Sequence, residues 1–228
     1  MTKYLLPITL TLVNLTTLTQ PTIAQIIPDG TTSTTITPEP TLDRISGQPL
    51  SPNATNLFHS FREFSIPPGH TAQFELPNDT ITTILTRITG TEPSQIDGTL
   101  TVEGTADLFF LNPNGIRFGQ DSRVTIGGDL ILTTADRIQF GDNLSFSATD
   151  TTTNPALLSI LVPTGLQFGE NPGPIVNQSR SPGLPPFVTN TDGKPIGITV
   201  APDQALLVLG GDITLEGVAS PRSMAPWN

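Results

Sequence analysis

The chain of 228 residues contains no cysteine, which excludes disulfides, thiolate metal sites and cysteine nucleophiles. Positive charge is also scarce, because 10 Lys and Arg against 20 Asp and Glu leave a formal net charge of −10. Such an acidic surface argues against nucleic acid or anionic lipid as a partner. Charged residues make up only 13% of the chain, which is unfavourable for solvated α-helices. Instead, abundant Thr with 20 Gly and 23 Pro favours short β-strands joined by turns.

The N-terminal 24 residues have the pattern of an export signal. Their only charge is Lys3, and a mostly apolar stretch without charge follows from Tyr4 to Leu18. Small residues then lead to Ala24, so we expect a Sec-type signal peptide over residues 1–24, cut between Ala24 and Gln25. The alternative is a short membrane anchor, but the stretch is shorter than the roughly 20 residues of a span. We therefore predict an exported protein without a membrane span.

Three segments of 14 residues align without gaps, at Ala106–Gly119, Gly128–Gly141 and Ala156–Gly169. The first two are offset by 22 residues, since Ala106 aligns with Gly128, and the third follows after 28. The aligned columns are apolar or glycine: Leu108, Leu130 and Leu158; Phe110, Leu132 and Ile160; Ile116, Ile138 and Leu166; Phe118, Phe140 and Phe168; Gly119, Gly141 and Gly169. The repeat lacks helical periodicity and alternates with a period of two, as strands do.

The alternation places Leu108, Phe110, Ile116 and Phe118 on one face, which a single repeat cannot bury. Stacking equivalent positions about 4.8 Å apart would build a continuous apolar column. The pattern therefore predicts an all-β protein formed as a parallel β-helix. An ordinary β-sandwich with chance internal similarity is the alternative.

The remaining segments are expected to decorate this solenoid. Thr- and Pro-rich residues 26–57 would form an N-terminal cap, with further strands at Phe58–Ile66 and Ile81–Ile88. Asn171–Pro202 is dense in Pro and Gly and predicts a long excursion from the coil. A weaker similarity links residues 100–104 to 213–217, and another links 127–129 to 210–212.

The most specific local motif is Asn112-Pro113-Asn114-Gly115-Ile116. Asn-Pro initiates turns and Asn-Gly tolerates positive φ, so the motif predicts a corner of the solenoid. The functional alternative is a turn whose exposed Asn side chains are recognised by a partner.

Other polar residues offer weaker candidates. Asp107 and Asp129 fall at equivalent repeat positions, where paired carboxylates could do acid–base chemistry or bind Ca²⁺, or simply be solvated. The two histidines, His59 and His70, match no zinc spacing, and we expect structural roles for both. Nucleophile, phosphate-loop and dinucleotide motifs are absent from the sequence. The residues thus predict no catalytic site, no metal and no cofactor.

Several separated stretches, covering roughly residues 25–217, resemble the N-terminal secretion domain of two-partner secretion exoproteins of the filamentous haemagglutinin type, most closely a cyanobacterial branch. The stretches that carry the resemblance are ATNLFHSFREFSI (54–66), ITGTEPSQIDGTL (88–100), ADLFFLNPNGIRFG (106–119), VTIGGDLILTTADRIQFGD (124–142), PTGLQFGENPGPIVNQS (163–179) and ALLVLGGDITLEG (205–217). The resemblance implies a right-handed parallel β-helix with an N-terminal cap and extra-helical β elements. It implies no enzyme activity in this domain.

The resemblance also implies a partner. In the family, the domain addresses an exoprotein to an outer-membrane β-barrel transporter with periplasmic POTRA domains, and the chain folds after crossing to the cell surface or medium. The family's NPNGI motif corresponds to residues 112–116, and its NPNL-type motif is matched partly by Asn154, Pro155, Ala156 and Leu157. The family's Gly-rich continuation is replaced here after Gly217, and we expect residues 218–228 to form an irregular tail.

Two other functions remain open from the sequence. A surface adhesin would bind glycan or a neighbouring or host cell through exposed aromatic residues in a groove. A β-helix enzyme acting on polysaccharide would need clustered acids beside Lys or Arg, and Asp107 with Asp129 would be its candidates.

Overall fold

The computed structural model describes residues 25–180 and 198–216. The predicted signal peptide, with Ala24, and the predicted tail at 218–228 lie outside the described residues. Within them, every regular element is a β-strand except two short 3-10 turns, η1 (Gly141–Asn143) and η2 (Pro155–Leu158). No helix in these two ranges is long and apolar enough to cross a membrane.

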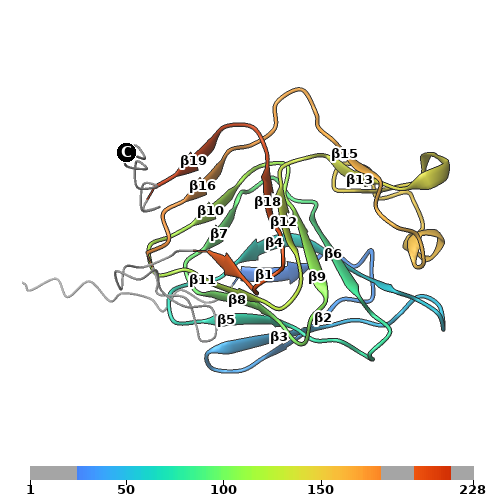
Figure 1. Ribbon diagram of the computed structural model, residues 1–228, viewed down its shortest axis with the longest axis horizontal. Helices are drawn as coiled ribbons and strands as arrows, with labels where there is room; N and C mark the ends of the chain where they lie inside the picture. The colour runs from blue at the N-terminus through green and yellow to red at the C-terminus, as the bar shows by residue number, and fades with distance from the viewer. Residues whose placement is uncertain (1–24, 181–197, 217–228) are drawn as a thin grey trace, which may run out of the picture.

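Three sheets surround one core (Figure 1). Sheet A contains β1 (Gln25–Pro28), β4 (Asn56–Ser65), β6 (Thr83–Ile88), β9 (Asp107–Leu111), β12 (Leu130–Thr133) and β18 (Leu206–Leu209). Sheet C contains β7 (Ser94–Ile96), β10 (Ile116–Phe118), β16 (Ile175–Asn177) and β19 (Ile213–Leu215). Sheet B contains β2 (Thr35–Pro38), β3 (Leu42–Ser46), β5 (Thr71–Phe74), β8 (Thr99–Val102), β11 (Arg123–Ile126) and β17 (Thr199–Val200).

The chain visits the sheets in the order A, C, B and then returns to A one layer further on, as β6–β7–β8 and then β9–β10–β11. Each strand pairs in parallel with its counterpart in the next coil. This is the right-handed parallel β-helix that the sequence predicted. At the N-terminal end, β1 pairs antiparallel with β4 and β2 pairs antiparallel with β3, so these strands cap the first coil.

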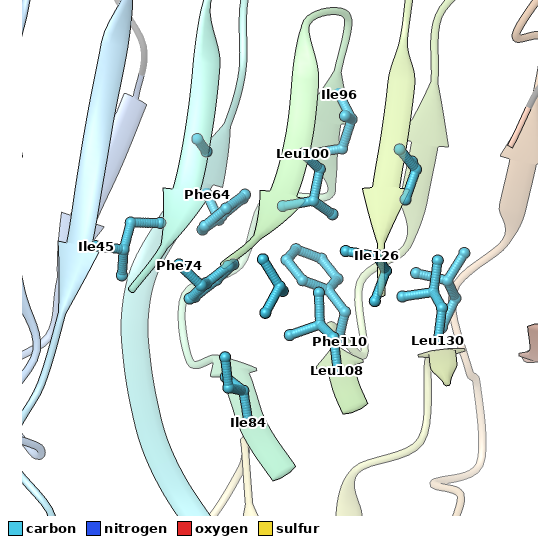
Figure 2. Packing of buried hydrophobic residues seen from close by; sticks show 14 of the residues in the cluster. Ile45, Phe64, Phe74, Ile84, Ile96, Leu100, Leu108, Phe110, Ile126 and Leu130 are labelled. Atoms are coloured by element: carbon cyan, nitrogen blue, oxygen red, sulfur yellow. The ribbon is translucent and has the colours of Figure 1, made fainter. Parts of the chain in front are cut away.

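The core is built of stacked apolar columns. In sheet A, Leu108 registers with Leu130, and Phe110 registers with Leu132, as the 22-residue repeat predicted. Figure 2 shows the side chains of the three sheets pointing toward one another, with Phe64, Phe74 and Phe110 among them. The ring centroids of Phe64 and Phe110 lie 5.0 Å apart in an edge-to-face arrangement. Burying each such side chain contributes about 1.5–3 kcal/mol to folding, so the columns stabilise the coil.

A fourth, antiparallel sheet lies outside the coil. This outer sheet joins β13 (Arg137–Gln139) to β14 (Ser145–Ser147) and β15 (Gly165–Gln167), and it appears in yellow and orange beside sheet A in Figure 1. It belongs to a second apolar cluster that covers the outward face of sheet A, formed by Phe58, Leu85, Leu111, Ala135, Ile138, Phe140, Phe146, Ala148 and Leu158. The strands β4, β6 and β9 of sheet A therefore have apolar clusters on both faces.

This outer sheet corrects the predicted third repeat. Ala156–Gly169 does not form a coil, because Leu158 ends η2 and residues 165–167 belong to the outer sheet. Ile138 likewise does not stack on Ile116, whose neighbours in sheet C are Ser94 and Ile175. Period-two alternation is the same for a strand inside a coil and for one packed on its outside, which explains the error.

The predicted excursion at Asn171–Pro202 is wrong at both of its ends, which contribute β16 to sheet C and β17 to sheet B, while residues 181–197 lie outside the described residues. The excursion that the structure describes comes earlier and runs through residues 137–167. The two weaker sequence similarities do not mark stacked positions either. Residues 100–102 lie in sheet B but 213–215 in sheet C, and residues 127–129 precede β12 whereas 210–212 precede β19.

Candidate site at the Asn112–Ile116 corner

The NPNGI motif forms the corner at which the chain leaves sheet A and enters sheet C. β9 ends at Leu111, and β10 begins at Ile116. The Gly115 amide donates to the Asn112 carbonyl oxygen at 3.1 Å, which closes a four-residue turn with Pro113 at its second position. Ile116 then points into the core while Arg117 is exposed. The predicted corner is thus present, with the turn chemistry that its residues favour.

The side chain of Asn112 is fully buried. Its Nδ2 donates to the Glu92 carbonyl oxygen at 3.1 Å and contacts the Ser94 Oγ at 3.0 Å, both in the preceding coil. Its Oδ1 accepts from the Asn114 backbone amide at 3.0 Å. Because buried polar groups are costly without partners, these bonds fix the corner on the coil beneath it.

The rest of the motif contacts both neighbouring coils. Asn114 Nδ2 donates to the Gly90 carbonyl oxygen at 2.8 Å in the preceding coil. The Pro113 carbonyl oxygen accepts from the Gly173 amide at 2.8 Å in the next coil. Gly115 has a φ of +125°, and a Cβ added there would lie 2.9 Å from the Pro174 carbonyl oxygen. The corner is therefore clamped from both sides, and in the folded protein its polar groups are largely occupied.

The partial second motif forms the same local turn in a different setting. Asn154 Oδ1 accepts from the Ala156 amide at 3.0 Å, and the Leu157 amide donates to the Asn154 carbonyl oxygen at 3.1 Å. This turn lies in the excursion, with Asn154 exposed and Leu157 exposed by 58%. The two Asn-Pro turns thus share their hydrogen-bond pattern, but the second continues as the 3-10 turn η2, and only the first is buried between coils.

Asp107 and Asp129 lie in successive coils, and the carboxylate of each accepts a backbone hydrogen bond from the next coil. Asp107 Oδ1 accepts from the Asp129 amide at 2.8 Å, and Asp129 Oδ1 accepts from the Ala205 amide at 2.7 Å. Burial raises the pKa of Asp107, the bond from the Asp129 amide opposes that rise, and the nearby Asp129 charge adds to it. The residue that follows Asp107 and Asp129 in the next coil is Ala205. The alignment of the three 14-residue segments instead places Leu157 at that position.

Both histidines contact neighbouring coil residues. His59 is fully buried, with its Nδ1 3.1 Å from the Thr34 Oγ1, its ring packed on Phe61 and Phe74, and no partner for its Nε2. His70 Nε2 lies 3.1 Å from Asp43 Oδ2. Across residues 25–180 and 198–216, no three His, Cys, Asp or Glu residues group in a way that could hold a metal ion.

One buried polar cluster had no signal in the sequence. Arg87 of β6 is fully buried, in a strand whose residues from Ile84 to Ile88 are all buried. Arg87 Nε lies 2.8 Å from the Ser60 Oγ, and its Nη1 donates to the Ser147 carbonyl oxygen at 2.7 Å. Nothing in the sequence indicates that Arg87 is buried, because one of its partners, Ser147, belongs to the outer sheet that covers sheet A.

Known proteins are similar to this chain over most of its length. The family model of the TPS secretion domain matches residues 24–225. Among solved structures, the HMW1 secretion domain from Haemophilus influenzae is similar, with a TM-score of 0.51 and 18% sequence identity. The alignment covers 85% of this chain and 40% of that one, so this chain spans well under half of its length. A search of curated proteins finds no match.

Proposed function

This chain belongs to the TPS (two-partner secretion) secretion domain family, and we propose that it targets an exoprotein to a dedicated outer-membrane transporter with periplasmic POTRA domains. The family match over residues 24–225 is the observation that carries the proposal. Under it, residues 1–24 direct Sec export into the periplasm and are removed after Ala24. Residues 25–217 are the secretion domain, and the product reaches the medium or the cell surface.

We place recognition before the corner closes. Asn112 is buried in the folded protein, and its amide bonds the coil beneath. A transporter can therefore reach the Asn112 side chain only while residues 112–116 are unfolded or partly folded, and the same opening releases the Asn114 amide from the Gly90 carbonyl oxygen. In that state the free backbone edge can pair with a POTRA strand by β-augmentation. Formation of successive coils outside then buries the apolar columns at about 25 cal/mol per Å², which favours outward movement.

The two alternatives have less support. An adhesin groove requires exposed aromatic rings, and among the described residues Phe168, at 39%, is the one aromatic ring that is exposed rather than buried or half-buried. A polysaccharide-acting enzyme would use Asp107 and Asp129, but each of these carboxylates accepts a backbone amide of the next coil.

The decisive experiment separates recognition from folding. The precursor is expressed in a Gram-negative host with and without its transporter, and the mature protein is quantified in medium and periplasm. We expect Asn112→Ala with Asn114→Ala to abolish transporter-dependent release.

Gly173→Ala is the matched control, because its Cβ would lie 2.3 Å from the Asn114 carbonyl carbon and disturb the same folded corner from outside the motif. We expect Gly173→Ala to lower the melting temperature while release continues. If release falls in both variants in proportion to the decrease in melting temperature, the motif acts only as a folded corner. If wild type is released without any transporter, the proposed function is wrong.

A further inference from the structure

Arg87 binds three segments that are far apart in the chain. Its Nη2 lies 2.9 Å from the Thr31 Oγ1 in the N-terminal cap, and its Nε lies 2.8 Å from the Ser60 Oγ in the first coil. Its Nη1 donates to the Ser147 carbonyl oxygen in the outer sheet at 2.7 Å, and the Phe146 ring centroid lies 4.4 Å from its guanidinium carbon. One side chain thus joins the cap, the coil and the β13–β14 hairpin.

Two hydroxyl groups lie between the Arg87 guanidinium and a carboxylate of opposite charge, that of Asp29. Ser60 Oγ donates to Asp29 Oδ2 at 2.6 Å, and Thr31 Oγ1 donates to Asp29 Oδ1 at 2.7 Å. Burial tends to raise the pKa of Asp29, but hydrogen bonds from Ser60, Thr31 and Thr89 outweigh it and lower the pKa. The hydroxyl groups of Ser60 and Thr31 therefore bridge the buried guanidinium to the Asp29 carboxylate of the cap.

The hairpin completes this site. Without β14, Arg87 Nη1 would lose its carbonyl acceptor, and Phe146 would no longer cover the guanidinium. A charged group buried without its partners is strongly destabilising, so the cap cannot close over Arg87 at full stability until β14 has docked. The reverse also holds, because couplings between two sites are reciprocal.

We propose that Arg87 is a latch that couples closure of the N-terminal cap to docking of the β13–β14 hairpin. Ser147 follows Arg87 by 60 residues, a length that spans about 200 Å when extended. The coupling itself is a property of the folded chain. Its consequence for export rests on the proposed function: in a chain emerging N-terminus first, the first coils would remain open to rearrangement until the hairpin had emerged as well.

A thermodynamic cycle tests the coupling. Thr31→Val removes the acceptor in the cap, Phe146→Leu removes the ring over the guanidinium, and urea unfolding gives the equilibrium constant of each single and double variant. We expect the unfolding equilibrium constant of the double variant to differ roughly tenfold from the value obtained by multiplying the two single effects, which is within the range seen for residues in one network. In an Arg87→Met background this factor should fall to about one.

Ile138→Val is the matched control in the same hairpin, because Ile138 registers with Phe146 but its side chain offers Arg87 neither a hydrogen-bond acceptor nor an aromatic ring. Its effect should multiply with that of Thr31→Val. A multiplicative Thr31→Val and Phe146→Leu pair, or one whose coupling persists in Arg87→Met, would overturn the latch.

Native-state hydrogen exchange provides a second readout that needs no cycle. In Phe146→Leu, the amides of β1 should exchange roughly tenfold faster relative to those of β8, whereas Ile138→Val should leave that ratio unchanged. If Phe146→Leu does not fold, Thr31→Val provides the reciprocal test. In that variant the amides of β14 should exchange faster relative to those of β8. An unchanged ratio in the folded variant overturns the proposal. Neither outcome depends on a transporter, so failure here is distinct from failure of the proposed function.

Discussion

Acidification should destabilise this protein through a single buried imidazole. His59 lies inside the coil between Phe61 and Phe74, and burial lowers its pKa from 6.5 to about 3. In the unfolded chain the ring regains its ordinary pKa near 6.5. Between about pH 6.5 and pH 3 the unfolded state therefore binds a proton that the folded state does not. By linkage, the free energy of unfolding falls as the pH falls through this window.

The magnitude follows from the two pKa values. Each pH unit inside the window costs about 1.4 kcal/mol. Between pH 8 and pH 5, where the unfolded ring becomes almost fully protonated, the loss amounts to about 2 kcal/mol. This is a large fraction of the 5–15 kcal/mol typical of a folded domain, so it is within reach of a urea titration.

The assay compares urea unfolding of wild type and His59→Phe from pH 8 to pH 5. The variant keeps a ring between Phe61 and Phe74 but cannot titrate, so carboxylate contributions common to both proteins cancel in the difference. We expect the difference in unfolding free energy to change by about 2 kcal/mol across this range. His70→Gln retains His59 and should retain that loss. Parallel curves for wild type and His59→Phe would refute the argument.

Three further predictions concern the coil, each measured by urea unfolding at neutral pH. Phe110→Ala should cost about 3–5 kcal/mol, because Phe110 is fully buried in the core column; a loss under 1 kcal/mol would contradict the packing. Gly115→Ala should cost about 1–3 kcal/mol, because the φ of +125° and the nearby Pro174 carbonyl oxygen both disfavour a Cβ; an unchanged stability would contradict it. Asp107→Ala should cost about 1–3 kcal/mol by leaving the Asp129 amide unpaired, whereas Asp107→Asn keeps an acceptor and should cost less. Equal losses for these two variants would show that the acceptor is not what matters.

The sequence determined those features that depend on neighbours along the chain or on a coil of constant length. The turn at residues 112–115 follows from Asn-Pro-Asn-Gly chemistry, because the hydrogen bonds that close it join residues two or three positions apart in the chain. The match of Leu108 to Leu130 follows because one coil without insertions brings residues 22 apart into register. Both features could be predicted because no distant segment competes for them.

The tertiary structure alone decided where residues 137–167 lie. Ile138 and Phe146 alternate with polar residues, and that pattern suits the inside of a coil as well as its outer surface. The outward row of sheet A, with Phe58 and Leu85, requires cover, and the hairpin supplies it. The burial of Asn112 and Arg87 was decided in the same way. Their partners come from other coils and from the outer sheet, and contacts between segments distant in the chain exist only once the coils have stacked.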